Sequence, residues 1–79
     1  MTNDTIKRGI RKALAEKEID IDRIQFSKIE RDGNEVKSIG KITLSLNSID
    51  GVELDWLKSK LDEYLESHGI DYNGILLDI

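Results

Sequence analysis

The spacing of the apolar residues changes twice along this 79-residue chain, and each change predicts a change of secondary structure. Over residues 4 to 18 they recur every three or four positions, as in a helix that buries one side. From residue 24 to 47 they alternate with polar residues, which is typical of half-buried strands. After residue 50 the helical spacing returns, and the closing "ILLDI" is typical of a strand. The sequence therefore predicts a single small α+β domain, residues 1 to 79, with the order α-β-β-α-β.

Capping residues predict where both helices begin and end. Asn3 or Asp4 can cap the first helix. The second is expected to start with Asp50 as N-cap and Glu53 three residues later, as in a capping box. It is expected to end at Gly69, with apolar Ile70 following as in a Schellman motif.

The segment "RDGNE" predicts a hairpin turn between the two strands of the middle region. A two-residue turn at Asp32-Gly33 would set Phe26 opposite Ile39 and Ile24 opposite the charged Lys41, so we favour a three- or five-residue loop that pairs the apolar residues with one another. Gly40 predicts a bulge or a close backbone approach.

The last strand is expected to lie beside the first, which gives the sheet order 2-1-3 with both helices on one face. Ile29 and Ile39 break the alternation. Either they flank the turn or a bulge, or they form an apolar patch on the open face with Leu76. That patch, or edge pairing of "ILLDI", would allow a homodimer.

Composition restricts the environment in which this chain works. With no cysteine it has neither disulfides nor thiolate metal ligands, which fits a reducing cytoplasm. Its longest apolar run, "ILL", is far below the ~20 residues that cross a bilayer, and "MTNDTIKRGI" lacks the apolar core of a signal peptide. We expect a cytoplasmic protein that does not associate with membranes.

Charge is distributed unevenly along the chain. The net charge is −4, and residues 47 to 79 hold two Lys against eight acids, whereas residues 1 to 46 hold ten Lys or Arg against eight acids. A small acidic protein of this kind is disfavoured as a general nucleic-acid binder, although a local basic stripe can still attract phosphates.

Trp56, the only tryptophan, lies on a different side of the second helix from the leucines. It falls about 140° from Leu61, whereas Leu54, Leu57 and Leu65 fall within about 60° of it. Two interpretations follow. The indole can fill a slot that Gly9 and Ala13 provide on the first helix, or it can be exposed and anchor a partner.

The outer side of the second helix is therefore the candidate partner-binding surface. Its anchor and rim would be Trp56, Ser59, Lys60 and Glu63, with Asp55, Asp62 and Glu66 setting the charge. The expected function is a non-catalytic protein-binding module, an adaptor, inhibitor or regulatory subunit. Short acidic chains without cysteine are common among phage accessory proteins, but that is only an association.

Nucleic-acid binding is the alternative function. Four cations lie within two turns on the polar side of the first helix: Lys7, Arg8, Arg11 and Lys12. The chain has no GxxG loop and no pair of stacking aromatic residues on its strands, so the marks of common RNA-binding modules are missing.

The sequence offers few candidate catalytic residues. His68 is the only histidine, and it lies at the end of the second helix, where an imidazolium interacts favourably with the helix dipole; this is a sufficient structural role. Asp71 and Tyr72 could also orient it as a base. No plausible nucleophile accompanies it. The carboxylates have no metal-ligand spacing and there is no Gly-rich phosphate loop, so we expect neither enzyme activity nor a metal or cofactor.

Overall fold

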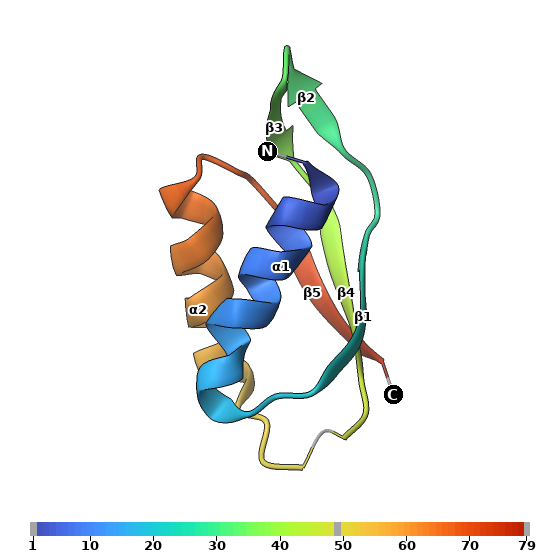
Figure 1. Ribbon diagram of the computed structural model, residues 1–79, viewed down its shortest axis with the longest axis vertical. Coiled ribbons are helices and arrows are strands. Elements are labelled where there is room, and N and C mark those ends of the chain that lie inside the picture. The colour runs from blue at the N-terminus through green and yellow to red at the C-terminus, as the bar shows by residue number, and fades with distance from the viewer. Residues whose placement is uncertain (1, 49, 79) are drawn as a thin grey trace.

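The computed structural model of the chain describes residues 2–48 and 50–78, and it is an α+β fold (Figure 1). Its elements follow in this order: α1 (Asn3–Leu14), the 3₁₀ turn η1 (Ala15–Lys17), β1 (Ile21–Phe26), β2 (Glu30–Asp32), β3 (Glu35–Ser38), β4 (Lys41–Leu46), α2 (Leu54–Ser67) and β5 (Gly74–Asp78). The last residue of the predicted terminal strand, Ile79, lies outside the described residues.

Helix α1 buries Ile6, Ile10 and Leu14, the stripe that the sequence predicts. Its N-cap is Thr2, whose hydroxyl accepts a hydrogen bond from the Thr5 N–H at 3.1 Å. The predicted caps, Asn3 or Asp4, are therefore wrong, because both residues already lie inside the helix. The α-helix also ends at Leu14 and gives way to η1, earlier than predicted.

Helix α2 begins at Leu54, later than predicted, and its N-cap is Glu53 without a side-chain capping bond. Asp50 is not the cap, because it lies in a turn where its own N–H donates to the Ser48 hydroxyl at 3.2 Å.

The C-terminal end of α2 is as predicted. The Ile70 N–H donates to the Leu65 carbonyl and the Gly69 N–H to the Glu66 carbonyl, which is the bond pair of a Schellman motif. Ile70 is buried beyond this end, so the motif also fixes where the chain re-enters the core.

The three long strands form a mixed sheet in the order β1-β4-β5, so the predicted order 2-1-3 is wrong. β4 pairs antiparallel with β1 and parallel with β5. Before β5 begins, the chain already pairs with the segment that leads from β3 into β4: the Asp71 N–H donates to the Lys37 carbonyl and the Asp71 carbonyl accepts from the Ile39 N–H. Apolar alternation could not reveal this choice, since it fixes the faces of a strand and not its neighbours.

The middle hairpin is divided between two sheets. Its base, β1 and β4, belongs to the three-stranded sheet, and its tip, β2 and β3, forms a separate two-stranded sheet. The apolar residues of β1 and β4 do pair as predicted, with Ile24 opposite Leu44 and Phe26 opposite Ile42. The loop, however, has only two residues, since Asp32 is opposite Glu35. A register shift between Glu30 and Arg31 takes up the extra residue that a three-residue loop would have held.

Gly40 makes the predicted close approach between the two halves of the hairpin. Its φ is +66°, and a Cβ placed there would lie 2.3 Å from the Ser27 hydroxyl oxygen. This irregular residue changes which face the neighbouring side chains point to. Ile39 is fully buried in the core and Ile29 is partly buried against it, so the predicted apolar patch on an open face is wrong, and only Leu76 is exposed there.

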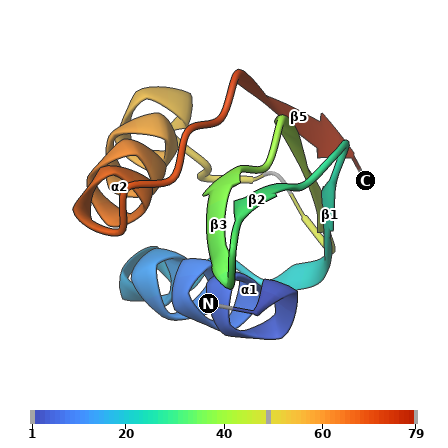
Figure 2. The same cartoon turned by 90° about the horizontal axis from the view of Figure 1, so that it is seen from above.

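One hydrophobic core joins the helices to the sheet. It contains Ile6, Ile10 and Leu14 of α1, Leu57, Leu61 and Leu65 of α2, and Ile24, Ile42 and Leu44 of the strands. Figure 2 shows α1 and α2 side by side, with the three long strands next to them. In the described part of the chain, no helix has the length and apolar character needed to span a membrane.

Candidate functional site

Trp56 lies partly buried at the end of α2 that is near η1. The Lys17 ammonium is 5.7 Å and the Lys60 ammonium 5.8 Å from the centre of its rings. Each of these cation–π contacts contributes about 0.5–1 kcal/mol at an exposed site. The indole is therefore held in one place while part of it remains accessible to solvent.

The slot at Gly9 is present, but Tyr64 and not Trp56 fills it. A Cβ at Gly9 would lie 2.0 Å from the Tyr64 hydroxyl oxygen and 2.2 Å from the adjacent ring carbon. The Gly9 residue thus allows close contact between α1 and α2. Burial raises the pKa of the Tyr64 hydroxyl above its usual value.

A groove of about 290 Å³ lies between the two helices. We call it the interhelical groove, and its lining residues are Ala13, Glu16, Lys60, Glu63, Tyr64 and Ser67. The Lys60 ammonium pairs with the Glu16 carboxylate at 3.1 Å across it. Lys60 is thus shared between Trp56 and Glu16, and two of the four predicted anchor and rim residues line one concave surface.

Asp62 faces the opposite side of α2 and is already engaged. Its carboxylate accepts a hydrogen bond from the hydroxyl of Tyr72, a residue that follows α2 in the chain. Burial, and then this bond, raise the pKa of Tyr72 above its ordinary value. The contact fixes the segment between α2 and β5, which gives Asp62 a structural role.

The other members of the predicted partner-binding surface are exposed. Ser59 and Glu66 are exposed, and Asp55 lies at the rim of a second groove. The structure therefore does not gather the seven predicted residues on one surface. Trp56, Lys60 and Glu63 lie toward α1, Asp55 and Asp62 lie toward β5, and of the exposed Ser59 and Glu66 the latter is near enough to Tyr72 for its charge to help raise the pKa of that hydroxyl.

The second groove was missed by the sequence analysis. This β5 groove, between the first turns of α2 and strand β5, has a volume of about 400 Å³ and is lined by Leu54, Asp55, Leu57, Lys58, Tyr72, Asn73, Gly74, Ile75 and Leu77. Leu54 was placed on the sheet side of α2 by its angle, yet it is 60% exposed. An angle around a helix axis says nothing of whether the sheet extends far enough to cover that turn.

Two of the four predicted cations on α1 are engaged with β1. The Arg11 guanidinium donates to the carbonyls of Ile21 and Asp22, at 2.5 and 3.2 Å, and the Lys7 ammonium is 5.6 Å from the centre of the Phe26 ring. These contacts tie α1 to the edge of the sheet.

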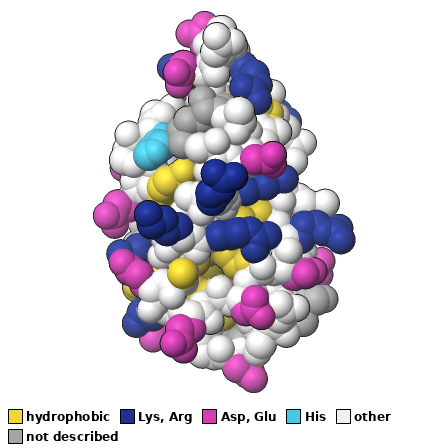
Figure 3. All heavy atoms as spheres, viewed as in Figure 1, with side chains coloured by type: hydrophobic (Ala, Val, Ile, Leu, Met, Phe, Trp, Pro, Cys, Tyr) yellow, Lys and Arg dark blue, Asp and Glu magenta, His cyan; other side chains and the backbone are white. Residues whose placement is uncertain are grey.

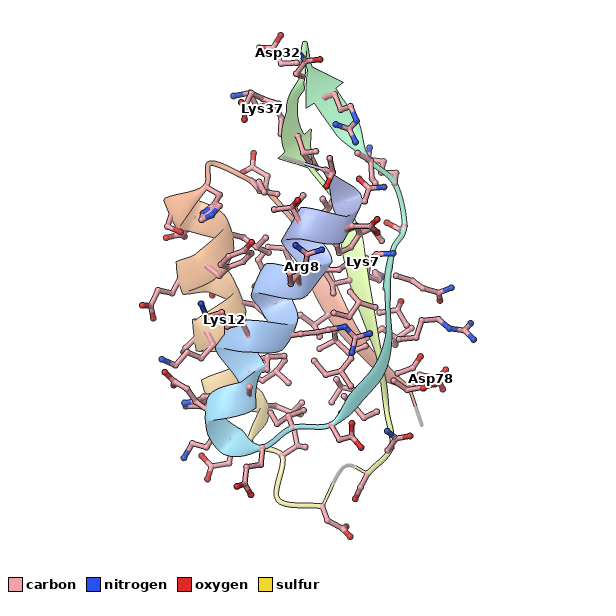
Figure 4. The ribbon with its side chains drawn as sticks, viewed as in Figure 1. Lys7, Arg8, Lys12, Asp32, Lys37 and Asp78 are labelled. Atoms are coloured by element: carbon pink, nitrogen blue, oxygen red, sulfur yellow. The ribbon has the colours of Figure 1, made fainter. Side chains whose placement is uncertain are left out.

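Arg8 and Lys12 are exposed one helical turn apart, and neither has an ion-pair partner within residues 2–48 and 50–78. Figure 3 shows cationic side chains gathered over α1, and Figure 4 shows that Arg8 and Lys12 project from this helix. This is the uncompensated part of the basic stripe.

His68 does not form the catalytic arrangement that Asp71 and Tyr72 would provide. Its Nδ1 lies 3.0 Å from the Ser67 hydroxyl and its ring contacts the Tyr64 ring at a tilt of 40°, whereas the Tyr72 hydroxyl bonds to Asp62. Within the described ranges, His, Asp and Glu side chains do not gather into a group of three that could bind a metal ion.

Comparisons with protein-family models, with curated proteins and with solved structures found no match to this chain.

Proposed function

We propose that this chain is a non-catalytic protein-binding module, an adaptor, inhibitor or regulatory subunit, that acts through the Trp56-bearing side of α2. The observation that carries the proposal is the state of Trp56, which is partly buried and fixed between Lys17 and Lys60. An aromatic ring that is already ordered loses little conformational entropy on binding, and this favours it as an anchor.

The surroundings of Trp56 indicate what a partner would present. The interhelical groove begins next to it, with Glu63 at its wall, and Ser59 and Glu66 are exposed on the adjoining surface. A complementary surface would insert a side chain into the groove and place cations opposite these carboxylates. Electrostatic complementarity of this kind would mainly raise the association rate.

Trp56→Ala tests the proposal. Partners captured by the wild-type chain from its native host are identified by mass spectrometry, and the affinity of the purified partner is then measured. We expect the variant to lose about 2 kcal/mol or more of binding free energy, as at an interface hot spot. Gln25→Ala, an exposed position on β1, is the matched control and should bind like wild type.

Folding must be measured in parallel, because the indole also packs against the core. Both variants are compared well below their melting temperatures. A Trp56→Ala chain that is folded and binds with wild-type affinity would contradict the proposal.

Nucleic-acid binding through α1 is the second candidate, and it is favoured by Arg8 and Lys12, which have no ion-pair partner in the described part of the chain. Because Arg11 and Lys7 are held against β1, the footprint would be small. An electrophoretic shift assay at about 50 and 200 mM salt is decisive, since affinity from phosphate contacts falls steeply with salt. No binding at the lower concentration, or binding unchanged in Arg8→Ala/Lys12→Ala, would rule this candidate out.

A further inference from the structure

The two edges of the three-stranded sheet differ in how they are protected. Edge strand β1 carries exposed Asp22, Arg23 and Gln25, has a register shift at Asp22, and gives two carbonyls near its start to Arg11. Charged side chains and irregular pairing are the usual means by which an edge is kept from pairing with another chain. On this side, a further strand is disfavoured.

Edge strand β5 has none of this protection along its middle. Its sequence is GILLD, with five regularly paired residues and no Lys, Arg or Pro. Leu76 is 54% exposed on one face, and on the other face Ile75 and Leu77 line the β5 groove with the 60% exposed Leu54. The two most exposed large apolar side chains of the described chain therefore lie at this edge.

The hydrogen bonds of β4 indicate which backbone groups of β5 are directed outward. The Lys41 carbonyl accepts from the Ser27 N–H, and the Asn47 N–H donates to the Asp20 carbonyl. The odd-numbered residues of this segment thus direct their backbone groups toward β1. Backbone groups alternate in direction along a strand, so those of the even-numbered residues point toward β5.

In the parallel ladder, Ile42 is opposite Ile75 and Leu44 is opposite Leu77. Only one residue of each such pair directs its N–H and C=O at the other strand, and in these pairs it is the β4 residue. The N–H and C=O groups of Ile75 and Leu77 consequently face the open edge. They provide two donors and two acceptors for another strand.

We infer that a second copy of this chain covers this edge, by antiparallel pairing of the two β5 strands about a two-fold axis at Leu76. In this register Ile75 is opposite Leu77 of the second copy, and the reverse, so all four outward backbone groups of each copy are bonded. Leu76 meets its own counterpart in a pair without hydrogen bonds, where side chains lie closest. The strand is complementary to itself in both bonding and apolar character.

Charge also favours a second copy as the occupant. The only charged residue of β5, Asp78, would lie opposite Gly74, so no like charges face each other along the strand. The rim of the β5 groove carries Asp55 and Lys58, one helical turn apart. These two charges are of opposite sign, so the rim of the groove adds no net like-charge repulsion between the two copies.

The oligomeric state tests this inference. Sedimentation equilibrium from about 10 µM to 1 mM spans the weak affinities of small interfaces. We expect the mean mass to rise with concentration from 9.0 kDa toward twice that value. The amides of Ile75 and Leu77 should exchange with solvent more slowly as concentration rises, because those N–H groups become bonded.

Leu76→Lys is the decisive variant, with Gln25→Lys on the other edge as matched control. Leu76→Lys sets two ammonium groups together at the axis and should raise the dimer Kd at least ~10-fold, whereas Gln25→Lys should leave it unchanged. Circular dichroism confirms that both fold. A chain monomeric at 1 mM, an unchanged Kd in Leu76→Lys, or concentration-independent exchange at Ile75 and Leu77 would overturn the inference. Trp56→Ala, which tests partner binding, should leave the dimer intact.

Discussion

Two aromatic residues of α2 contact the first helical segment at different levels. Trp56 lies by Lys17 and Tyr64 lies against Gly9, because the two helices run in opposite directions (Figure 1). Each ring thus has its own neighbour: a pair of ammonium groups for the indole and a glycine backbone for the phenol.

Gly9→Ala should destabilise the protein, although alanine is the better helix former. The substitution gains about 1 kcal/mol of helix propensity, but its Cβ would collide with the Tyr64 ring, and overpacking of this kind costs about 1–3 kcal/mol. We expect Tm to fall by several degrees.

The double-mutant cycle with Tyr64→Ala isolates this contact. Once the ring is removed, Gly9→Ala should become neutral or stabilising. A loss of stability of the same size with and without the ring would mean that Gly9 serves another purpose.

The partly buried Tyr72 hydroxyl predicts a loss of stability at high pH. Its pKa is raised in the folded chain, by burial and by the bond to Asp62, so above about pH 10 the unfolded state releases the proton before the folded state does. The stability is therefore intact below pH 10 and declines as pH rises through the folded pKa.

Urea unfolding at pH 8, 10 and 11 checks this prediction. The decline should be smaller in Tyr72→Phe, and some should remain because the pKa of Tyr64 is raised as well. Equal slopes for wild type and Tyr72→Phe would refute the assignment.

Among the single residues, the sequence predicted that Gly9 provides a slot for an aromatic ring, but the ring proposed for it was Trp56, whereas Tyr64 fills it. A helical wheel gives the direction of Trp56 around α2 and not its level along α1. By its spacing Tyr64 also lies within about 60° of Leu61, on the side of the leucines, and apolar spacing does not distinguish a ring that packs against a glycine from one that packs against the sheet.

At the scale of elements, the start of α2 is less well capped than its end. Glu53 has an extended backbone, with φ −97° and ψ 111°, but its side chain bonds no backbone N–H of the first turn. The shorter side chain of serine reaches those groups more readily.

Glu53→Ser should therefore stabilise the protein, by about 0.5–1 kcal/mol, as judged from the midpoint of urea unfolding. Asp50→Ala is the control: Asp50 was predicted from sequence to be the cap, and its replacement should change stability by less than about 0.5 kcal/mol. A larger loss in Asp50→Ala would restore the original assignment.

The existence and type of the long elements followed from periodicity, and so did the pairing of the apolar residues of β1 with those of β4, although not the particular partner of each residue. The division of the hairpin into two sheets did not, because it depends on the conformation of single residues such as Gly40. The neighbour of the last strand was also mispredicted, since it is fixed by backbone bonds of Asp71 that carry no side-chain pattern.

At the scale of the whole molecule, β2 and β3 project beyond the body at one end of a structure 39 Å long and 21 by 19 Å across (Figure 1). All three residues of β2 are exposed, and Val36 is the one buried residue of β3. Local opening is easiest where few apolar contacts must be broken.

Amide hydrogen exchange should therefore separate two regions. The amides of Arg31 to Glu35 should exchange early, whereas those of Ile42 and Leu44, in the central strand, should exchange only on global unfolding. Equal protection in both regions would show that the projecting hairpin is as stable as the core sheet.

Of the features of the candidate sites, the distribution of charge was the one that the sequence predicted best. Sequence spacing placed the cations on α1 and the acids on α2, and Figure 4 shows the cations Arg8 and Lys12 projecting from α1. The β5 groove could not be predicted, because helical spacing does not tell which turns of α2 the sheet covers, and Leu54 is left exposed.

The irregular backbone at Gly40 also determines where this chain can change length. A residue inserted in the projecting hairpin would displace only its tip, because the segment after Gly40 takes its orientation from β1 and β5. The same insertion within β4 would exchange Ile42 and Leu44 with Thr43 and Ser45, and so turn hydroxyls into the interior. Tolerance to insertion should therefore be lost between the tip of the hairpin and Lys37, where the backbone bonds to Asp71 begin.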